Sequence, residues 1–199
     1  ANVVRERLGR QVRRADSRSE SPFVIFRELA LKGVFTIDLD PIVDERGFFA
    51  RSWCVREFEE NGLDARLVQC NLSYNKVKGT LRGMHYQVAP AAEVKVVRCT
   101  SGTICDVIVD LRQDSPTYKR SLSVLLSAEN RRMLYIPQHF AHGFLTLADH
   151  TEVLYQMSEF YTPSCARGFR WNDPSFDISW TDEVRVISEK DRTYPDFVG

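Results

Sequence analysis

The sequence predicts an all-β protein, an antiparallel sandwich or barrel with a few short helices. From residue 33 onward the chain divides into short runs rich in Val, Ile, Leu, Thr and Tyr, which favour strands. Gly, Pro, Asn, Asp and Ser separate these runs, as is typical of turns between antiparallel strands. Because the chain shows no G-x-G-x-x-G motif, no P-loop and no alternation of strands with helices, a Rossmann-type fold is not expected.

The chain is expected to hold one domain, over residues 23–199, behind a polar extension over residues 1–22. This extension is rich in Arg and Ser and lacks the apolar core of a secretory signal. Acidic residues interrupt it, so a polar arm or one amphipathic helix is favoured over a transit peptide.

The first strand of the domain is predicted within residues 33–43. Apolar and polar side chains alternate there, and Val34, Ile37 and Leu39 are expected to face the core. A turn at residues 46–47 then leads into a second strand.

The stretch SWCVREFEENGL, residues 52–63, predicts a short helix that Ser52 caps and that ends before Gly62. The remaining strands are predicted within residues 65–75, 80–88, 94–112, 118–127, 130–147 and 151–161. In the third of these runs, the TSG sequence before Thr103 predicts a hairpin. The last 25 residues are expected to form turns and short helical pieces that cover the sheet.

Charge and cysteine content exclude several classes of protein. The 27 basic and 27 acidic residues cancel, so there is no overall field for nucleic acid or an anionic membrane. No apolar run approaches the roughly 18 residues of a membrane-spanning helix. The cysteines are odd in number and form no C-x-x-C pair, which is typical of reduced thiols, so we expect a cytoplasmic protein.

One histidine stands out in the stretch TLRGMHYQ, residues 80–87. His85 lies between two runs that are predicted to be strands. An imidazole titrates near neutral pH and also binds metals, so the residue types alone leave three interpretations open. His85 can be a base, a metal ligand or a hydrogen-bonded residue of the core.

Eight segments together resemble the dTDP-4-dehydrorhamnose 3,5-epimerase family, and they follow one another in the family's order between residue 34 and about residue 192. The segments are DERGFF, QCNLS, KGTLRGMHYQ, KVVRCTSGTICDVIVDLRQDSPTY, LSAENRRMLYIPQHFAHGFL, EVLYQMSEFYTP, RWNDPSFDISW and ISEKD. The resemblance implies a cupin-type double-stranded β-helix, or jelly roll. It also implies an isomerase that needs no cofactor or metal and acts on a nucleoside-diphosphate 4-keto-6-deoxy-hexose, most plausibly dTDP-4-dehydro-6-deoxy-D-glucose.

The reaction that the family catalyses inverts carbon 3 and carbon 5 of the sugar, next to the ketone. It needs a base on one face, a proton donor on the other and a group that holds the enolate oxygen. The resemblance implies that His85 is the base and that Asp191 orients it, as the carboxylate does in a Ser-His-Asp triad. Asp106 is a rival partner for His85, because its strand enters the barrel.

The opposite face and the enolate have candidates of their own. Tyr155, in EVLYQM, would be the acid, since a phenol is neutral at pH 7 and can donate. Lys95 would stabilise the developing enolate, and His142 would be a second polar group near the sugar. His139 has no counterpart in the family and is expected at the surface.

Substrate binding is assigned to a further group of residues by the same resemblance. Arg82 and Arg46 would bind the diphosphate, because a guanidinium matches phosphate oxygens. Gln69 and Asn71 would hold the sugar or the ribose. The nucleobase would lie between the flat faces of Phe49 and Tyr161.

Four positions depart from the family pattern. Arg51 replaces a Glu that lies near the nucleotide, and an Arg side chain can only donate hydrogen bonds. Cytosine offers acceptors to such a donor, so a CDP-linked substrate is an alternative; otherwise Arg51 points to solvent or to a second subunit. Leu72 replaces a His, Glu93 a Gln and Cys105 a Phe, which leaves open whether one carbon or both are inverted.

Three other functions compete with this one. Metal-dependent cupins use an H-x-H pair, a Glu and a later His; here His85, Glu93 and His142 remain, but Gln87 replaces the second His and is a poor ligand. A 3,4-ketoisomerase or single-carbon epimerase and a catalytically silent binder are the others. The resemblance also implies a homodimer that exchanges N-terminal strands and a role in dTDP-rhamnose or other deoxysugar biosynthesis.

Overall fold

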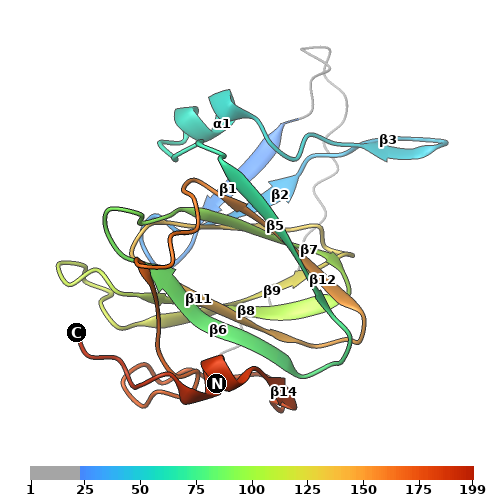
Figure 1. Ribbon diagram of the computed structural model, residues 1–199. Helices are drawn as coiled ribbons and strands as arrows, with labels where there is room; N and C mark the ends of the chain where they lie inside the picture. The colour runs from blue at the N-terminus through green and yellow to red at the C-terminus, as the bar shows by residue number, and fades with distance from the viewer. Residues whose placement is uncertain (1–22) are drawn as a thin grey trace.

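The computed structural model describes residues 23–199, so the predicted extension over residues 1–22 lies outside the described residues. Two six-stranded sheets face each other, which confirms the predicted all-β fold (Figure 1). The pairs along the first sheet are antiparallel. Its strands, in spatial order, are β1 (Val24–Glu28), β2 (Phe35–Leu39), β10 (Met133–Ile136), β7 (Lys95–Ser101), β12 (Thr151–Met157) and β5 (Gln69–Asn75).

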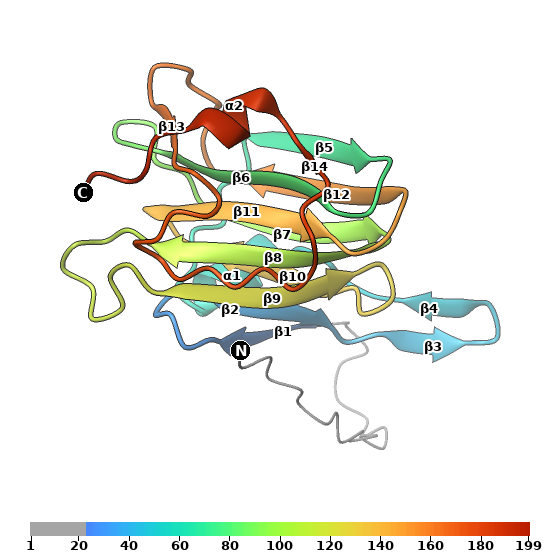
Figure 2. The ribbon, with the colours of Figure 1, turned by 90° about the horizontal axis from the view of Figure 1, so that it is seen from below.

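The second sheet contains the strand that carries His85. In spatial order it comprises β13 (Ala166–Gly168), β6 (Thr80–Gln87), β11 (Phe140–Thr146), β8 (Thr103–Asp110) and β9 (Ser121–Ser127), with β14 (Val186–Ile187) added parallel to β6. A separate hairpin of β3 (Ile42–Asp44) and β4 (Gly47–Phe49) projects from the body of the domain (Figure 2). The helices are α1 (Val55–Glu60) and α2 (Glu189–Thr193).

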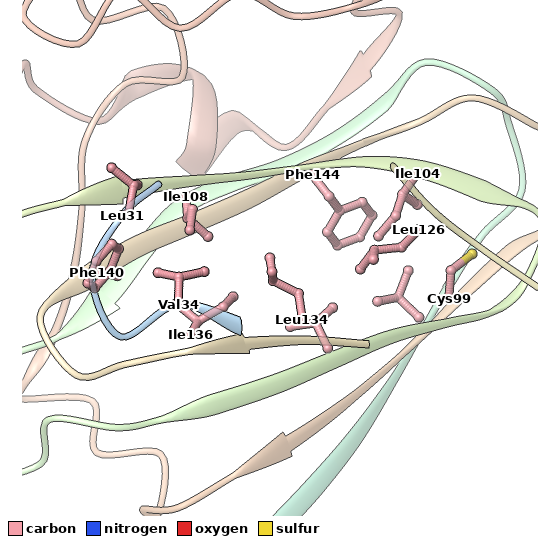
Figure 3. Close-up of a cluster of buried hydrophobic side chains, with 12 residues drawn as sticks. Leu31, Val34, Cys99, Ile104, Ile108, Leu126, Leu134, Ile136, Phe140 and Phe144 are labelled. Atoms are coloured by element: carbon pink, nitrogen blue, oxygen red, sulfur yellow. The ribbon is translucent and has the colours of Figure 1, made fainter. Parts of the chain in front are cut away.

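The main hydrophobic core lies between the two sheets. Alternate side chains of each strand point into this space, because successive residues of a strand face opposite sides. Figure 3 shows two groups of these side chains, one around Phe140 and Ile136 and one around Phe144 and Leu126. The buried members of this core are Leu31, Val34, Val97, Cys99, Ile104, Ile108, Leu126, Leu134, Ile136, Phe140, Phe144 and Val153.

Both outer faces are covered as well. Helix α1 inserts the fully buried Phe58 against the outer face of the first sheet. The C-terminal part of the chain covers the second sheet, where the ring of Phe169 stacks on that of Phe176. This confirms the prediction that the last residues cover the sheet, and it brings α2 beside β6.

Several local predictions were wrong at the start of the domain. The first strand is β1 (Val24–Glu28), whereas the sequence predicted none before residue 33. The strand predicted over residues 33–43 is interrupted after β2, because Asp40 and Pro41 separate it from β3. Val34 and Ile37 are buried as predicted, whereas Leu39 is only partly buried. The helix α1 begins after Cys54, whose side chain makes no capping hydrogen bond, so Ser52 is not the N-cap.

Neither helix of the described residues is long and apolar enough to cross a membrane.

The hairpin predicted at residues 101–103 is also wrong. Gly102 does make a tight turn, with φ of +75°. However, β7 pairs with β10 and β12 of the first sheet, whereas β8 pairs with β9 and β11 of the second. The turn therefore carries the chain from one sheet to the other instead of joining two paired strands.

The pairing of β6 with β11 places two histidines side by side. His85 lies opposite His142 in this register. Two residues earlier, Gly83 has a φ of +133°, and a Cβ atom there would lie 2.5 Å from the Cα atom of Gly143. Only a glycine permits this approach, so the geometry of the two histidines depends on it.

We predict that Gly83→Ala destabilises the fold more than Gly47→Ala. Gly47 has a similar φ of +128°, but a Cβ atom there meets nothing within 4 Å. Both variants therefore carry the same backbone strain, which should lower the free energy of unfolding by about 1–2 kcal/mol in each. The clash in Gly83→Ala should add about 1–3 kcal/mol. Urea unfolding of both variants measures the difference, and equal losses would contradict this account of the strand crossing.

Candidate active site

A hydrogen-bonded pair of His85 and Asp191 forms the centre of the site. His85 projects from β6, and its Nε2 lies 2.7 Å from Oδ1 of Asp191, on α2. The His85 side chain is 41% exposed, whereas that of Asp191 is only 7% exposed. The carboxylate is therefore buried behind a ring that remains accessible from the cavity.

Local structure explains how Asp191 reaches β6 from a position 106 residues further along the chain. Strand β14 pairs in parallel with the first residues of β6. Ser188 then caps α2 by accepting a hydrogen bond from the Asp191 backbone N–H at 3.1 Å. The second carboxylate oxygen, Oδ2, accepts from the backbone N–H of Gly83 at 3.3 Å. Asp191 thus holds both the imidazole and the strand that carries it.

The environment of Asp191 favours its charged form. Burial alone would raise the pKa of this carboxyl, but the hydrogen bond from His85, its charge and the Gly83 N–H outweigh burial and lower the pKa. With Nε2 of His85 engaged by the carboxylate, Nδ1 is the ring nitrogen left for a proton from elsewhere. A neutral imidazole held in this tautomer is suited to act as a base.

Tyr155 lies across a cavity of about 370 Å³ from this pair. It comes from β12 of the first sheet, and its ring contacts His142 edge-on, with 6.1 Å between the centroids. Burial is the largest influence on the Tyr155 hydroxyl and raises its pKa; a hydrogen bond with Ser73 acts in the opposite direction. The phenol therefore keeps its proton at neutral pH and can donate it.

Two further nitrogen-bearing side chains line the cavity, and each contacts its own buried acidic side chain. Nζ of Lys95, on β7, lies 3.0 Å from Oε1 of Glu93. Nε2 of His142, on β11, lies 2.9 Å from Oδ2 of Asp106. Because Asp106 bonds to His142, the rival prediction that Asp106 orients His85 is wrong.

The cavity also brings together half of the predicted binding residues, with His142 among them. Asn71, Arg82 and Tyr161 line it with the groups described above. Nε of Arg82 donates to Oδ1 of the buried Asn75 at 2.8 Å, which fixes the guanidinium from behind. Gln69 stands at the edge instead, where its Oε1 accepts from the Tyr161 backbone N–H at 3.2 Å. His139 is exposed, as predicted.

Three predicted binding residues do not reach this cavity within the same chain. Arg46 lies at the turn of the β3–β4 hairpin and pairs with Asp44. Phe49, on the same hairpin, is 67% exposed. Arg51 forms an ion pair with Glu57 of α1. None of the three lines the cavity. The motif predicted a function for them but could not predict which surface they would face.

Sequence reasoning missed several residues of the cavity. Ser73 follows Asn71 by two positions on β5, and Gln87 follows His85 by two on β6, so the period of a strand is the signal that could have found them. Lys190 precedes Asp191 on α2, but nothing in its spacing singles it out. The residues of the lining for which no role was predicted are Leu72, Ser73, Tyr86, Gln87, Glu93, Phe144, Met157, Ala166, Arg167, Lys190 and Tyr194.

The residues of the rival metal site are engaged in other contacts. Gln87 donates from Nε2 to Oε2 of Glu93 at 3.0 Å and accepts at Oε1 from the Thr162 N–H at 2.7 Å. Glu93 and His142 pair with Lys95 and Asp106. Over residues 23–199, no cluster of three or more His, Cys, Asp or Glu side chains has the arrangement of a metal site. The geometry therefore gives the metal-dependent alternative no support.

A β-sandwich whose cavity holds an orientated imidazole facing a neutral phenol defines a class of acid–base enzyme. Comparison with known proteins identifies the family. The family model described as dTDP-4-dehydrorhamnose 3,5-epimerase matches residues 28–198. The chain belongs to this family.

Relatives and solved structures agree with this assignment. The chain is 46% identical, over 156 residues, to dTDP-4-dehydrorhamnose 3,5-epimerase of Shigella flexneri, covering 78% of this chain and 86% of that protein. The Bacillus anthracis enzyme of the same name, solved with TDP and pyrophosphate bound, superposes with a TM-score of 0.84 at 39% identity, covering 88% of this chain and all of that one (100%).

A third comparison includes a bound sugar nucleotide. The dTDP-6-deoxy-D-glucose-3,5-epimerase of Legionella pneumophila, solved in complex with dTDP-4-keto-L-rhamnose, superposes with a TM-score of 0.78 at 35% identity. The match covers 85% of this chain and 90% of that one. These structural matches confirm the predicted cupin-type jelly roll.

From the lowered pKa of Asp191 we predict how the free energy of unfolding depends on pH. Its ionised form stabilises the fold above the usual pKa of 3.8, and this contribution is lost as the pH falls through the lowered pKa. Asp191→Asn should therefore cost about 1–3 kcal/mol at neutral pH and progressively less in acid. Urea unfolding at about pH 7 and about pH 3 measures the change.

The exposed Asp177 provides a matched control. Asp177→Asn should stay within about 0.5 kcal/mol of the wild type at both pH values. A cost of Asp191→Asn that does not change between the two pH values would contradict the assigned role of the ionised carboxylate.

Proposed function

We propose that this protein is a dTDP-4-dehydrorhamnose 3,5-epimerase that inverts carbons 3 and 5 of dTDP-4-dehydro-6-deoxy-D-glucose. The observation that carries the proposal is that the His85–Asp191 pair, Tyr155 and Lys95 line one cavity, with His85 on the second sheet and Tyr155 and Lys95 on the first. An inversion needs these three functions in one site: a base, a donor on the other face and a cation at the oxygen.

The chemistry follows from the ketone at carbon 4. Nδ1 of His85 removes the proton from carbon 3 or carbon 5, and the electron pair moves to the ketone oxygen as the enolate forms. Asp191 stabilises the imidazolium, and the Lys95 ammonium stabilises the enolate oxygen, which has little competing water. Tyr155 then protonates the carbon from the opposite face. The cycle closes when His85 releases its proton to water and the phenolate regains one.

Binding residues extend the proposal along the substrate. Arg82 would contact the diphosphate, because its guanidinium is already held in one orientation by Asn75. Asn71 and His142 would contact the sugar, with Gln69 at the edge of the same region. Tyr161 is 53% exposed at the rim of the cavity, which suits a ring that stacks on a nucleobase.

The dTDP form of the substrate is favoured over the CDP form. The CDP alternative depended on Arg51 donating to the base, yet this guanidinium is paired with Glu57 of its own chain. The similar enzymes whose structures hold nucleotides were solved with TDP or a dTDP-sugar. The similarity to 3,5-epimerases likewise favours inversion at both carbons over a single one.

A homodimer with shared sites would explain the position of the β3–β4 hairpin. This hairpin projects from the domain (Figures 1 and 2). Its apolar side chains are exposed, including Val43 (73%) and Phe49 (67%). An exposed group of this kind is typical of an interaction surface. We infer that the hairpin enters the cavity of a second copy, where Arg46 and Phe49 contact the nucleotide.

Domain organisation and location complete the proposal. Residues 23–199 would act as one epimerase domain behind the extension of residues 1–22. All five cysteines are free thiols, and three of them are buried, which favours a reducing compartment such as the cytoplasm. The enzyme would serve the biosynthesis of dTDP-rhamnose or a related deoxysugar.

Proton NMR in heavy water tests the proposed function directly. With dTDP-4-dehydro-6-deoxy-D-glucose, the wild-type protein should replace the protons at both carbon 3 and carbon 5 by deuterium, and the CDP-linked sugar should react more slowly. Exchange at one carbon would identify a single-carbon epimerase. Absence of exchange in folded protein would contradict the proposal.

Mixing two inactive variants tests the shared site. His85→Ala removes the base and Arg46→Ala removes the hairpin contact, so each homodimer should have little activity. A heterodimer of the two would contain one intact site out of two. About half of the dimers in a randomly assorted mixture are heterodimers, so the mixture should have about one quarter of the wild-type activity. Co-expression with two affinity tags isolates the heterodimer. A heterodimer no more active than its parents would show that the site lies within one chain.

A further inference from the structure

Glu93 forms a buried ion pair with the cation that the proposed mechanism places at the enolate. The side chains of Lys95 and Glu93 are only 12% and 6% exposed, and their charged atoms lie 3.0 Å apart. A lysine ammonium sits on a flexible four-carbon stem and has no preferred orientation of its own. A single buried carboxylate at this distance restricts it to one place.

The other oxygen of Glu93 is held in turn by Gln87. Nε2 of Gln87 donates to Oε2 of Glu93 at 3.0 Å and contacts the Ala91 carbonyl oxygen at the same distance. Gln87 is buried, so these hydrogen bonds face little competition from water. The carboxylate of Glu93 therefore bridges two side chains, one from β6 and one from β7.

Gln87 also holds the segment that carries Tyr161. Its Oε1 accepts from the Thr162 N–H at 2.7 Å, and its Nε2 lies 3.2 Å from the Phe160 carbonyl oxygen. These two backbone groups flank Tyr161 directly. One buried amide thus connects the rim of the cavity, where Tyr161 stands, with the carboxylate that holds Lys95.

We propose that Glu93 and Gln87 are positioning residues that hold the Lys95 ammonium at the enolate and tie it to the Phe160–Thr162 segment. The inference rests on the proposed function for the role of Lys95. It adds that occupancy of the nucleotide side of the cavity and the placement of the ammonium depend on the same buried network. A nucleobase that orders Tyr161 also steadies Lys95, through Thr162, Gln87 and Glu93.

A double-mutant cycle tests the first half of the proposal. Glu93→Met keeps about the length of the side chain and removes the oxygens that hold the ammonium, so kcat should fall about 10- to 100-fold. Lys95→Met should lose at least as much. The double variant should be no slower than Lys95→Met alone, because Glu93 acts only through that lysine. Glu93→Asp, which keeps the charge, should recover part of the loss.

The matched control is Glu152→Gln, which removes a carboxylate from β12 away from the cavity and should leave kcat within about twofold. Additive losses in the cycle would overturn the proposal, as would a Glu93→Met variant as fast as the wild type. Thermal unfolding of each variant confirms that the proteins compared are folded.

Calorimetric titration with dTDP tests the second half without any turnover. Gln87→Met removes the hydrogen bonds to both sides of the network, so it should lower kcat and also weaken dTDP binding about 5- to 10-fold. Glu93→Met should lower kcat but leave dTDP binding within about twofold. If Gln87→Met does not fold, Gln87→Asn replaces it. Unchanged dTDP binding in a folded Gln87 variant would overturn the coupling.

Acylation of the Lys95 amine, followed by mass spectrometry, separates this inference from the proposed function. The ion pair should protect the amine, so Glu93→Met should increase the rate of acylation several-fold over the wild type. This result is independent of catalysis. A wild-type protein that fails to exchange the sugar protons but shows this protection would refute the proposed function and keep the positioning network. Equal acylation rates would refute the network itself.

Discussion

The hydrogen bond between His85 and Asp191 is the contact on which the rest of the site depends. It joins a strand in the middle of the second sheet to a short helix near the end of the chain, 106 residues away. The helix is in place because β14 pairs with β6 and Ser188 caps the turn that follows. The same carboxylate accepts from the backbone of Gly83, where only glycine fits between β6 and β11. Orientation of the base is therefore a consequence of how the C-terminal segment covers the sheet.

The nitrogen-bearing side chains of the cavity are held in three local pairs. His85, Lys95 and His142 each contact a different buried acidic side chain: Asp191, Glu93 and Asp106. Such pairing fixes the direction in which each side chain presents its free side to the cavity. Tyr155 differs, because burial raises its pKa and keeps it neutral. The cavity thus combines two positioned imidazoles and one ammonium with a neutral hydroxyl donor.

The sequence predicted the strands well, because their apolar residues recur with the period of a sheet and Gly, Pro and Asn mark their ends. It failed where a local signal has two structural outcomes. Gly102 permits a tight turn, but the same turn serves a hairpin or a crossing between sheets, and only the long-range pairing of β7 and β8 decides. The cap of α1 was misplaced for a similar reason, because Ser52 is a good N-cap type but the helix begins three residues later.

The residues of the site were likewise predicted in part. The motifs predicted that His85, Asp191, Tyr155 and Lys95 share one site, and these four residues do line one cavity, on paired strands and the short helix α2. Arg46 and Phe49 lie on a hairpin that leaves the domain, and no local pattern shows which chain it contacts. The Gln87–Glu93 bridge was also missed, since the strand period places Gln87 on the face of His85 but no local pattern shows that Glu93 meets it.

A crystal structure of the protein with bound dTDP-4-dehydro-6-deoxy-D-glucose, in a variant with His85 replaced by Asn, tests the central claim most directly. The account predicts that the sugar ring lies between residue 85 and Tyr155, with carbons 3 and 5 within about 3.5 Å of these side chains on opposite faces. It also predicts the ketone oxygen beside Lys95. A sugar bound with both side chains on one face, or with the ketone turned away from Lys95, would contradict the account.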